Sequence, residues 1–270
     1  MRCKFANALV AATTIVALAC IYALGSVGSA QAPATSKKPV LVELFTSEGC
    51  SSCPPADALL AQLGSRQPIA GAETIILEEH VDYWDDQGWH DPFSSAAATA
   101  RQRDYAFRLG GEVYTPEMIV DGRAAFVGSA DAEARREIDA AIGAPKAEIH
   151  LSWDNAAAGV AGNPPILHIQ VGRLPATADR TKPDVFLAIT ESHLHSSVLR
   201  GENTGRALDH DGVVRSLTRI GAATSQTDTA FSSQATTKLN SDWKRENLRA
   251  VVFVQDPHSR RIFAVASIPF

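Results

Sequence analysis

Residues 43–57 read ELFTSEGCSSCPPAD and carry a Cys-x-x-Cys motif, Cys50 and Cys53, between an apolar run and a helical segment. The other two cysteines, Cys3 and Cys20, lie in an N-terminal segment that we predict to be removed. Within one mature chain the pair can therefore bond only with each other. Closing so short a loop stabilises the folded chain by only about 2 kcal/mol in the chain-entropy model. Reversible redox chemistry is therefore the first hypothesis for this motif.

The N-terminus has the pattern of a secretory signal peptide. Arg2 and Lys4 precede an apolar run over residues 8–24, and Ala30-x-Ala32 is typical of a signal-peptidase site. We predict cleavage near Ala32 and a periplasmic or secreted mature protein, in which a disulfide would persist. An uncleaved membrane anchor is the alternative, because the apolar run is close to the length that spans a bilayer.

Charge and composition are those of an ordinary globular protein. The chain has 25 basic and 30 acidic side chains, and the basic residues form no stripe that could follow a phosphate backbone. We therefore predict no nucleic-acid partner, and membrane attachment only through an uncleaved N-terminus. Residues 33–145 carry 9 basic and 18 acidic groups, whereas residues 146–270 carry 14 and 12. This difference supports a signal peptide at 1–32 followed by two domains, 33–145 and 146–270.

The first half alternates short apolar runs with helical segments. The runs and their turn signals predict the order βαβαββα. The seven elements are expected at Val40–Phe45, Pro54–Leu63, Thr74–Val81, Phe93–Leu109, Glu117–Val120, Ala124–Val127 and Ala132–Ile142. Asp121-Gly122, between the last two strands, is a strong hairpin signal. The sequence therefore predicts an α/β domain.

This order of elements, with Cys-x-x-Cys opening the first helix and Thr115-Pro116 preceding the hairpin, resembles the thioredoxin fold over about residues 38–143. The resemblance implies that Pro116 is a cis-proline beside the disulfide and that Thr115 contacts an extended substrate. At closer range, residues 43–57, 80–84 (HVDYW) and 200–203 (RGEN) resemble an uncharacterised family of secreted bacterial proteins. That likeness implies a thioredoxin-like domain joined to a β-rich domain, with no settled activity.

The positions of the cysteines suggest different roles for them. Cys50 lies near a helix N-terminus, where unpaired N–H groups favour a thiolate, so it is the predicted nucleophile. Cys53 precedes Pro54 and is the predicted N-cap and resolving partner. Glu43 resembles the buried carboxylate of thioredoxins that moves a proton for the second cysteine, and a partnered structural carboxylate is the alternative. Asp57 is interpreted as an acid that compensates the helix dipole.

Trp84 belongs to an aromatic loop, residues 82–92, that directly follows a predicted strand. Loops at strand ends often bind ligands, so Trp84 is a predicted substrate-binding residue, with a small satellite core as the alternative. His80, Asp82 and His90 also raise the hypothesis of a copper site shared with the two thiolates. Their spacing matches no known metal motif, and we therefore predict neither a metal nor a cofactor.

The second half contains apolar or alternating runs at the spacing of a β-sandwich. They lie at Ala147–Trp153, Ile166–Val171, Val185–Thr190, Val213–Ile220, Ala230–Leu239, Leu248–Gln255 and Ile262–Ile268. A long polar loop over 191–212 contains His193, His195 and His210, which we interpret as solvated rather than metal-binding. We expect residues 200–203 of this loop to tie it to the first half.

Two classes of function follow. The favoured one is a secreted or periplasmic thiol–disulfide oxidoreductase, in which Cys50 attacks a protein or small-molecule disulfide and Cys53 resolves the mixed disulfide. Its partners would be that substrate and a redox partner. The alternative is a binding or scaffold protein with a structural disulfide, and a copper-handling protein is the third reading. The exposure of Cys50 discriminates the first two, because an attacking sulfur must be reachable.

Overall fold

The computed structural model describes residues 37–154, 164–178, 181–225 and 227–270. Residues Lys37–Phe270 cluster as one compact unit. The predicted signal peptide, residues 1–32, lies outside the described residues. No helix among the described residues is both long enough and apolar enough to cross a bilayer.

The described first half follows the predicted order βαβαββα. Its elements are β1 (Lys38–Thr46), α2 (Pro54–Arg66), β2 (Ala72–His80), α3 (Ala96–Leu109), β3 (Glu117–Val120), β4 (Ala124–Val127) and α4 (Asp131–Ile142). The second half adds β5 (Ile149–Trp153), β6 (Ile166–Gly172), β7 (Asp184–Glu191), β8 (Leu194–Ser197), β9 (Ala207–His210), β10 (Val213–Ala222), β11 (Thr229–Thr236), β12 (Leu248–Gln255) and β13 (Ile262–Pro269).

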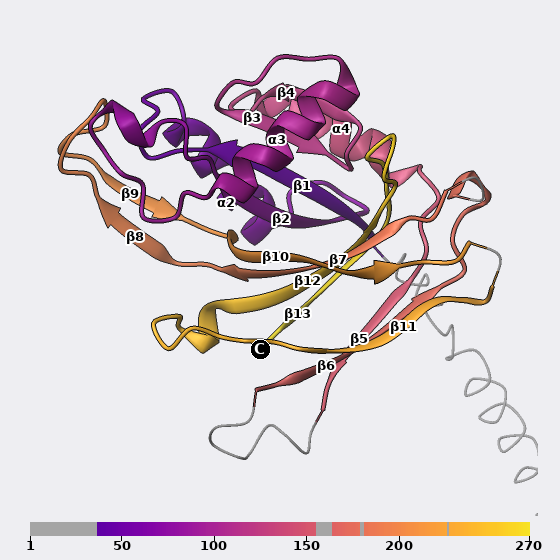
Figure 1. The fold of residues 1–270 in the computed structure, drawn as a ribbon. Coiled ribbons are helices and arrows are strands. Elements are labelled where there is room, and N and C mark those ends of the chain that lie inside the picture. The colour runs from indigo at the N-terminus through magenta and orange to yellow at the C-terminus, as the bar shows by residue number, and fades with distance from the viewer. Residues whose placement is uncertain (1–36, 155–163, 179–180, 226) are drawn as a thin grey trace, which may run out of the picture. The chain divides into compact units, whose positions relative to one another are not determined.

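Eight strands form one mixed sheet in the order β13-β12-β7-β10-β2-β1-β3-β4. Strand β1 runs parallel to β2 and antiparallel to β3, and β4 is antiparallel to β3. The other four strands come from the second half, so this sheet continues across the predicted domain boundary at residue 145. Strands β11, β6 and β5 form a second sheet, drawn below the first in Figure 1, and pack against β7, β12 and β13. The second half is therefore layered, and one layer is shared with the first half.

Strand β1 is covered on both faces, as expected for a strand whose central residues are apolar apart from Glu43. Val40, Val42 and Leu44 pack in a cluster with residues of α2 and α4. The alternate residue Phe45 points to the other face and packs against Tyr105 of α3. The Cys-x-x-Cys segment follows β1 directly and is thereby fixed between this strand and α2.

Helix α3 and the strands β8 and β9 differ from the sequence prediction for local reasons. Helix α3 begins at Ala96 rather than Phe93, because the Ser95 hydroxyl accepts a hydrogen bond from the Ala98 N–H and caps the helix there. Strands β8 and β9 were expected to be loop. They pair only with each other and alternate exposed with less exposed residues, so they have no apolar run to reveal them.

Strands β2 and β10 join the two halves through a short parallel contact in which Val213 lies opposite Glu78. The Glu78 N–H donates to the Gly212 carbonyl at 2.9 Å. The Glu78 carboxylate adds a 2.7 Å hydrogen bond with His210 Nδ1 and a 2.9 Å bond from the Asp211 N–H. Buried Glu78 therefore makes several of the hydrogen bonds that join the two halves.

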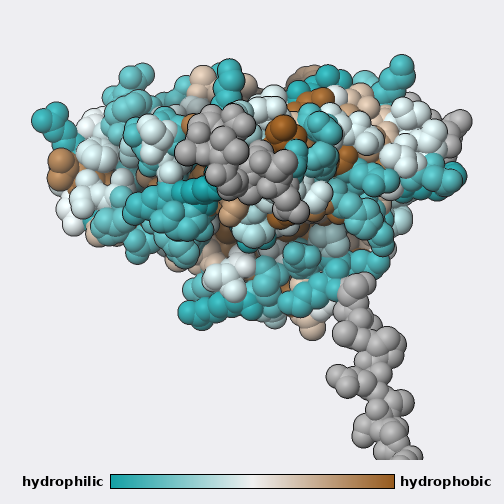
Figure 2. Space-filling model, turned by 90° about the horizontal axis from the view of Figure 1, so that it is seen from below, coloured by the Kyte–Doolittle hydropathy of each residue, from teal (hydrophilic) through white to brown (hydrophobic). Residues whose placement is uncertain are grey.

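The molecular surface in the view of Figure 2 is mainly hydrophilic, and apolar side chains gather there in small patches. Large exposed apolar side chains among the described residues are few, and Phe107 and Leu199 are the most exposed of them. Single exposed apolar residues are normal on soluble proteins. Many ionisable side chains of this protein, among them several glutamates and two histidines, are instead buried.

Replacing Gly122 with Ala should destabilise the protein more than replacing Gly110 with Ala. Both glycines have positive φ, 65° and 71°, so they share a conformational cost of about 1–2 kcal/mol. A Cβ on Gly122 would lie 1.9 Å from the Arg260 carbonyl oxygen, whereas nothing lies within 4 Å of one on Gly110. We expect a further loss of about 1–3 kcal/mol for Gly122→Ala, measured by urea unfolding. Equal losses would contradict this close approach of the two halves.

Candidate functional site

Cys50 and Cys53 form a disulfide at the start of α2. Cys53 is the N-cap residue, and Pro54 and Pro55 occupy the first helical positions, as the sequence predicted. Both cysteines are 0% exposed. A thiol reagent or substrate therefore cannot reach either sulfur in this conformation.

Residues 198–206 bind the backbone of the Cys-x-x-Cys segment, and we call them the covering loop. Asn203, which is fully buried, donates through Nδ2 to the carbonyl oxygens of Glu48 and Cys50, each at 2.9 Å. The Ser51 N–H donates to Glu202 Oε2 at 3.1 Å. These bonds confirm that residues 200–203 tie the polar loop to the first half. They attach it to the backbone of the Cys-x-x-Cys segment itself.

Trp84, Thr115 and Pro116 lie beside this segment. The Trp84 indole N–H donates to Thr115 Oγ1 at 2.8 Å, and the Thr115–Pro116 peptide bond is cis. A Cβ added to Gly49 would lie 3.1 Å from Trp84 Cβ, so the aromatic loop packs directly against the Cys-x-x-Cys segment. The structure therefore brings Trp84 into contact with Thr115 and places Trp84 next to Gly49 of the Cys-x-x-Cys segment.

Pro116 also lies close to the first turn of α2. A Cβ added to Gly128 would come within 3.1 Å of both Pro116 Cβ and Ala56 Cβ. Gly128 donates its N–H to the Pro116 carbonyl at 2.9 Å. The absence of a side chain at Gly128 lets the cis-proline segment approach the helix that carries Cys53.

Glu43 lies on the face of β1 that packs against α3. Its two oxygens accept from Arg101 Nε at 2.7 Å and Nη2 at 2.9 Å, and Oε1 also accepts from the Tyr105 hydroxyl at 2.7 Å. Arg101 in turn lies 3.1 Å from Glu79. Both oxygens of Glu43 thus have hydrogen-bond partners. This geometry is that of a partnered structural carboxylate, which was the alternative interpretation of Glu43 from the sequence.

Asp57 is the carboxylic acid on the helix that carries Cys53, one turn further along. It is buried rather than exposed at the helix start, and Oδ1 accepts from the Thr46 hydroxyl at 2.6 Å. Burial, together with the charge of Glu78, raises the pKa of Asp57 to about 7, against the opposing effect of His210. An acid with such a pKa can accept and return a proton near neutral pH. From the sequence, compensation of the helix dipole was favoured over a catalytic role for Asp57, because the burial that raises its pKa depends on tertiary packing.

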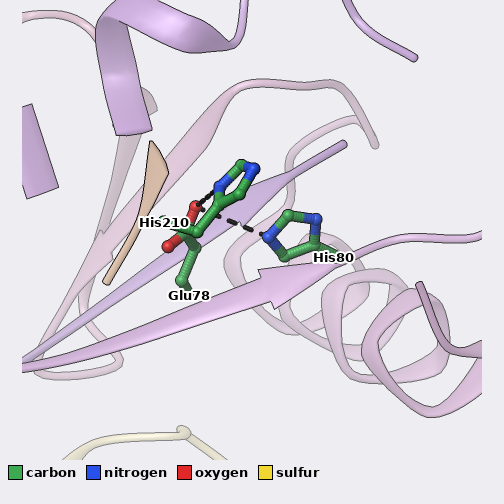
Figure 3. A group of neighbouring side chains, drawn as sticks. All are labelled: Glu78, His80 and His210. Carbon is green, nitrogen blue, oxygen red and sulfur yellow. Dashed lines mark hydrogen bonds and ion pairs between the residues drawn. The ribbon is translucent and has the colours of Figure 1, made fainter. Parts of the chain in front are cut away.

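A cluster of buried acids and histidines lies next to the covered disulfide. Glu78 and His80 lie on β2, and His210 is the last residue of β9. Both imidazoles face the Glu78 carboxylate (Figure 3). Glu78 Oε1 lies 2.7 Å from His210 Nδ1 and 3.4 Å from His80 Nε2. Asp91 Oδ2 lies 2.7 Å from His80 Nδ1, and Glu48 Oε1 lies 3.3 Å from His210 Nε2. The two imidazoles thus alternate with three carboxylates.

The carboxylates hold both imidazoles in their charged form. Burial alone lowers the pKa of His80, but Asp91 and Glu78 outweigh it and raise that pKa to about 9. For His210, Glu78 and Glu48 likewise outweigh burial and raise the pKa to about 11. The pKa of Asp91 is lowered, since His80 outweighs its own burial. Buried ions at this density persist only because each has a partner.

The histidine groups considered from sequence are not the ones that the structure brings together. His90 is exposed and pairs with Asp85, and Asp82 accepts from the Thr99 hydroxyl. His193 and His195 are also exposed, and each pairs with a nearby aspartate. His80 meets His210, 130 residues away. Only the tertiary pairing of β2 with the second half could reveal this cluster.

Comparison with known structures supports the fold. A crystal structure of a protein from Agrobacterium tumefaciens matches with a TM-score of 0.64 and 24% identity, over 85% of this chain and 92% of that chain. HBP35 of Porphyromonas gingivalis matches with a TM-score of 0.66 and 16% identity, over 87% of this chain and 76% of that chain. At these identities the likeness concerns the fold alone.

No curated protein sequence matches this chain. A family model described as "Protein of unknown function (DUF1223)" matches residues 41–255. This match includes β1 from its fourth residue, the Cys-x-x-Cys segment, the covering loop and the buried histidine cluster. It ends at the last residue of β12. The chain therefore belongs to the DUF1223 family.

Proposed function

We propose that this protein is a thiol–disulfide oxidoreductase of thioredoxin-like architecture that acts in the periplasm or outside the cell. The observation that carries the proposal is the placement of Cys50–Cys53 at the start of α2, beside the cis Thr115–Pro116 bond and Trp84. The strand order β2-β1-β3-β4, with its mixture of parallel and antiparallel pairs, supports the resemblance drawn from sequence.

The reaction would proceed by two thiol–disulfide exchanges. The Cys50 thiolate attacks one sulfur of a substrate disulfide, forms a mixed disulfide and expels the first substrate thiolate. Cys53 then loses its proton and attacks Cys50, which releases the second substrate thiolate and leaves the Cys50–Cys53 disulfide. Two electrons pass to the substrate, and a dithiol redox partner restores them. The reverse sequence oxidises a substrate dithiol.

Asp57 is the group that we assign to the proton of Cys53. It lies one helical turn beyond Cys53, and its backbone N–H donates to the Cys53 carbonyl at 3.1 Å. Its pKa of about 7 lets it take a proton from a neighbouring thiol near neutral pH. Glu43, the sequence candidate for this role, is engaged by Arg101 and Tyr105 on the other face of β1.

Exchange requires the covering loop to open. Residues 202 and 203 form the tip of this loop. They are held on the first half by the two Asn203 bonds and by the Glu202 bond to Ser51. Each neutral hydrogen bond contributes about 0.5–1.5 kcal/mol. Opening is therefore a local event that costs far less than unfolding, and the Cys-x-x-Cys segment can remain in place beneath it.

The full burial of both cysteines favours a second function, in which the disulfide is structural and the protein binds or organises a partner. The two functions differ in the chemistry of the sulfurs. A structural disulfide has a reduction potential below about −300 mV, whereas a labile one lies higher.

The cysteine variants test the proposed exchange. For the mature protein, we expect a Cys50–Cys53 potential above about −250 mV in glutathione buffers, with Cys50 alkylated first. Cys50→Ser should abolish exchange with a peptide disulfide, and Cys53→Ser should accumulate mixed disulfides, both read by mass spectrometry. Slow, equal labelling and a potential below about −300 mV would instead identify a structural disulfide.

Asn203→Ala should expose the disulfide more often. Loss of two hydrogen bonds, about 1–3 kcal/mol in all, should speed reduction by dithiothreitol roughly 5- to 100-fold. Thr204→Ala is the matched control, since its exposed side chain bonds only within the covering loop. Stopped-flow fluorescence and alkylation trapping measure the rate. If both variants reduce at the parental rate, the covering loop does not limit access.

Asp57→Asn should change how stability depends on pH. In the unfolded chain the Asp57 pKa is near 4, whereas burial and Glu78 raise it to about 7 in the folded protein, opposed by His210 and His80. The folded state then binds more protons between about pH 4 and pH 7, so its stability falls as pH rises through that window. The variant should gain up to about 4 kcal/mol relative to the parent between those limits.

Urea unfolding at several pH values measures this difference. Asp131→Asn is the control, because Asp131 also lies in the first turn of a helix but is exposed. Its stability relative to the parent should stay constant with pH. Parallel pH profiles for Asp57→Asn and the parent would show that Asp57 ionises normally.

A further inference from the structure

We propose that Glu78, His80 and His210 bind a divalent first-row transition-metal ion, with zinc as the ion that the ligand set suits best. This site lies beyond the proposed redox function and uses neither cysteine. It also departs from the sequence prediction, which assigned no metal ligand. The three residues each offer one ligand atom, all within 4.8 Å of one another, and all three are buried.

The spacing of the donor atoms is close to that of a metal site. Glu78 Oε1 lies 2.7 Å from His210 Nδ1 and 3.4 Å from His80 Nε2, and Figure 3 shows both rings directed at this carboxylate. Zinc bonds to nitrogen and oxygen are about 2.0–2.2 Å long, which separates two donors by roughly 3.0–3.5 Å. All three donor atoms lie within 4.8 Å of one another, so the side chains would have to close around an ion to reach this spacing.

The nitrogen of His80 that faces the site is unusual because it makes no hydrogen bond within the described residues, although it is fully buried. Its other nitrogen, Nδ1, lies 2.7 Å from Asp91. Metal-binding histidines characteristically present the second nitrogen to a carboxylate in this way, which fixes the ring and leaves the first nitrogen for the ion. Asp91 is itself fixed by the N–H groups of Glu48 and Phe93.

His210 repeats the arrangement. With Nδ1 toward the ion, its Nε2 faces Glu48 Oε1 at 3.3 Å, and neither of these buried atoms makes a hydrogen bond within the described residues. Glu48 is held by the Trp89 indole N–H at 2.7 Å. Glu78 is held from behind by the Asp211 N–H, which donates to Oε2 at 2.9 Å. The positions of the ligands and of their supporting carboxylates are therefore set before an ion binds. Both imidazoles are protonated in the metal-free protein, so a binding ion displaces one proton from His80 Nε2 and one from His210 Nδ1.

The donor types select the ion. Two imidazoles and one carboxylate suit zinc and other borderline divalent ions, and leave one coordination position open. The set contains no thiolate, so it does not match the soft ligands that select monovalent copper. A pocket of about 330 Å³, lined by His80, Phe93, Arg215 and Trp243 among others, adjoins the site on the side of His80.

An ion here would stabilise the fold, because its ligands come from both halves. Glu78 and His80 belong to β2, and His210 ends the strand that follows the covering loop. The ion would cross-link these segments in the folded state only. Binding at 100 times the dissociation constant should then raise the melting temperature by roughly 5–10 °C.

The test uses the oxidised mature protein, in which Cys50 and Cys53 form a disulfide and therefore cannot bind zinc as thiolates. The protein is refolded with and without zinc, dialysed against a zinc buffer and assayed for bound metal and melting temperature. We expect one zinc ion per chain. Cobalt should give the intense visible absorption of a four-coordinate site, whereas an octahedral ion on the surface absorbs only weakly.

Variants locate the ion. His80→Gln and His210→Gln should lose the bound zinc and the thermal shift, and Asp91→Asn should bind zinc about 10- to 100-fold more weakly. His90→Gln is the matched control, since His90 is exposed and bonds Asp85. The proposal is overturned if the unmodified protein binds zinc no more tightly than His80→Gln, or if His90→Gln loses as much as the ligand variants. Neither result bears on thiol exchange, which is measured separately.

Discussion

Glu78 fixes the second half of the protein onto the first with its backbone and its side chain together. Its N–H bonds Gly212, and its carboxylate binds His210 and the Asp211 N–H. A buried carboxylate is costly without partners. Burial tends to raise the pKa of Glu78, but the two imidazoles outweigh it and lower that pKa. Strand β2 can therefore be buried in the middle of the sheet only when β9 brings His210 to the same place.

Other buried polar groups are also satisfied across long stretches of chain. Arg101 bridges Glu43 of β1 and Gln255 of β12, and Asn203 binds the carbonyl of Cys50. Removing one partner of a buried charge pair typically costs about 3–5 kcal/mol. Apolar packing would tolerate small shifts between the halves, whereas these directional bonds do not. The continuous sheet and the buried polar bonds thus make one compact unit from segments that the sequence suggested were two domains.

The sequence predicted the local features well and the long-range ones poorly. Apolar runs, the Asp121-Gly122 turn and the Pro54-Pro55 pair placed the first-half elements, because these signals are short-range. Thr115, Pro116 and Trp84 were also predicted near the disulfide. The shared sheet, the cover over Cys50 and the partners of Glu43 depend on residues about 60 to 150 positions away. No periodicity along the chain encodes which strand of the second half lies against β2.

The bonds that cover the disulfide are made almost entirely to main-chain groups. Asn203 binds two carbonyls, and Glu202 binds one N–H, of residues 48–51. An extended peptide offers the same kinds of donor and acceptor, so in the proposed exchange a substrate strand would replace these bonds. His210, by contrast, is anchored by charge beyond the end of the covering loop. Residues 202 and 203 are therefore held by hydrogen bonds to main-chain groups, whereas the chain just beyond the covering loop is held by the buried charge pair of His210 and Glu78.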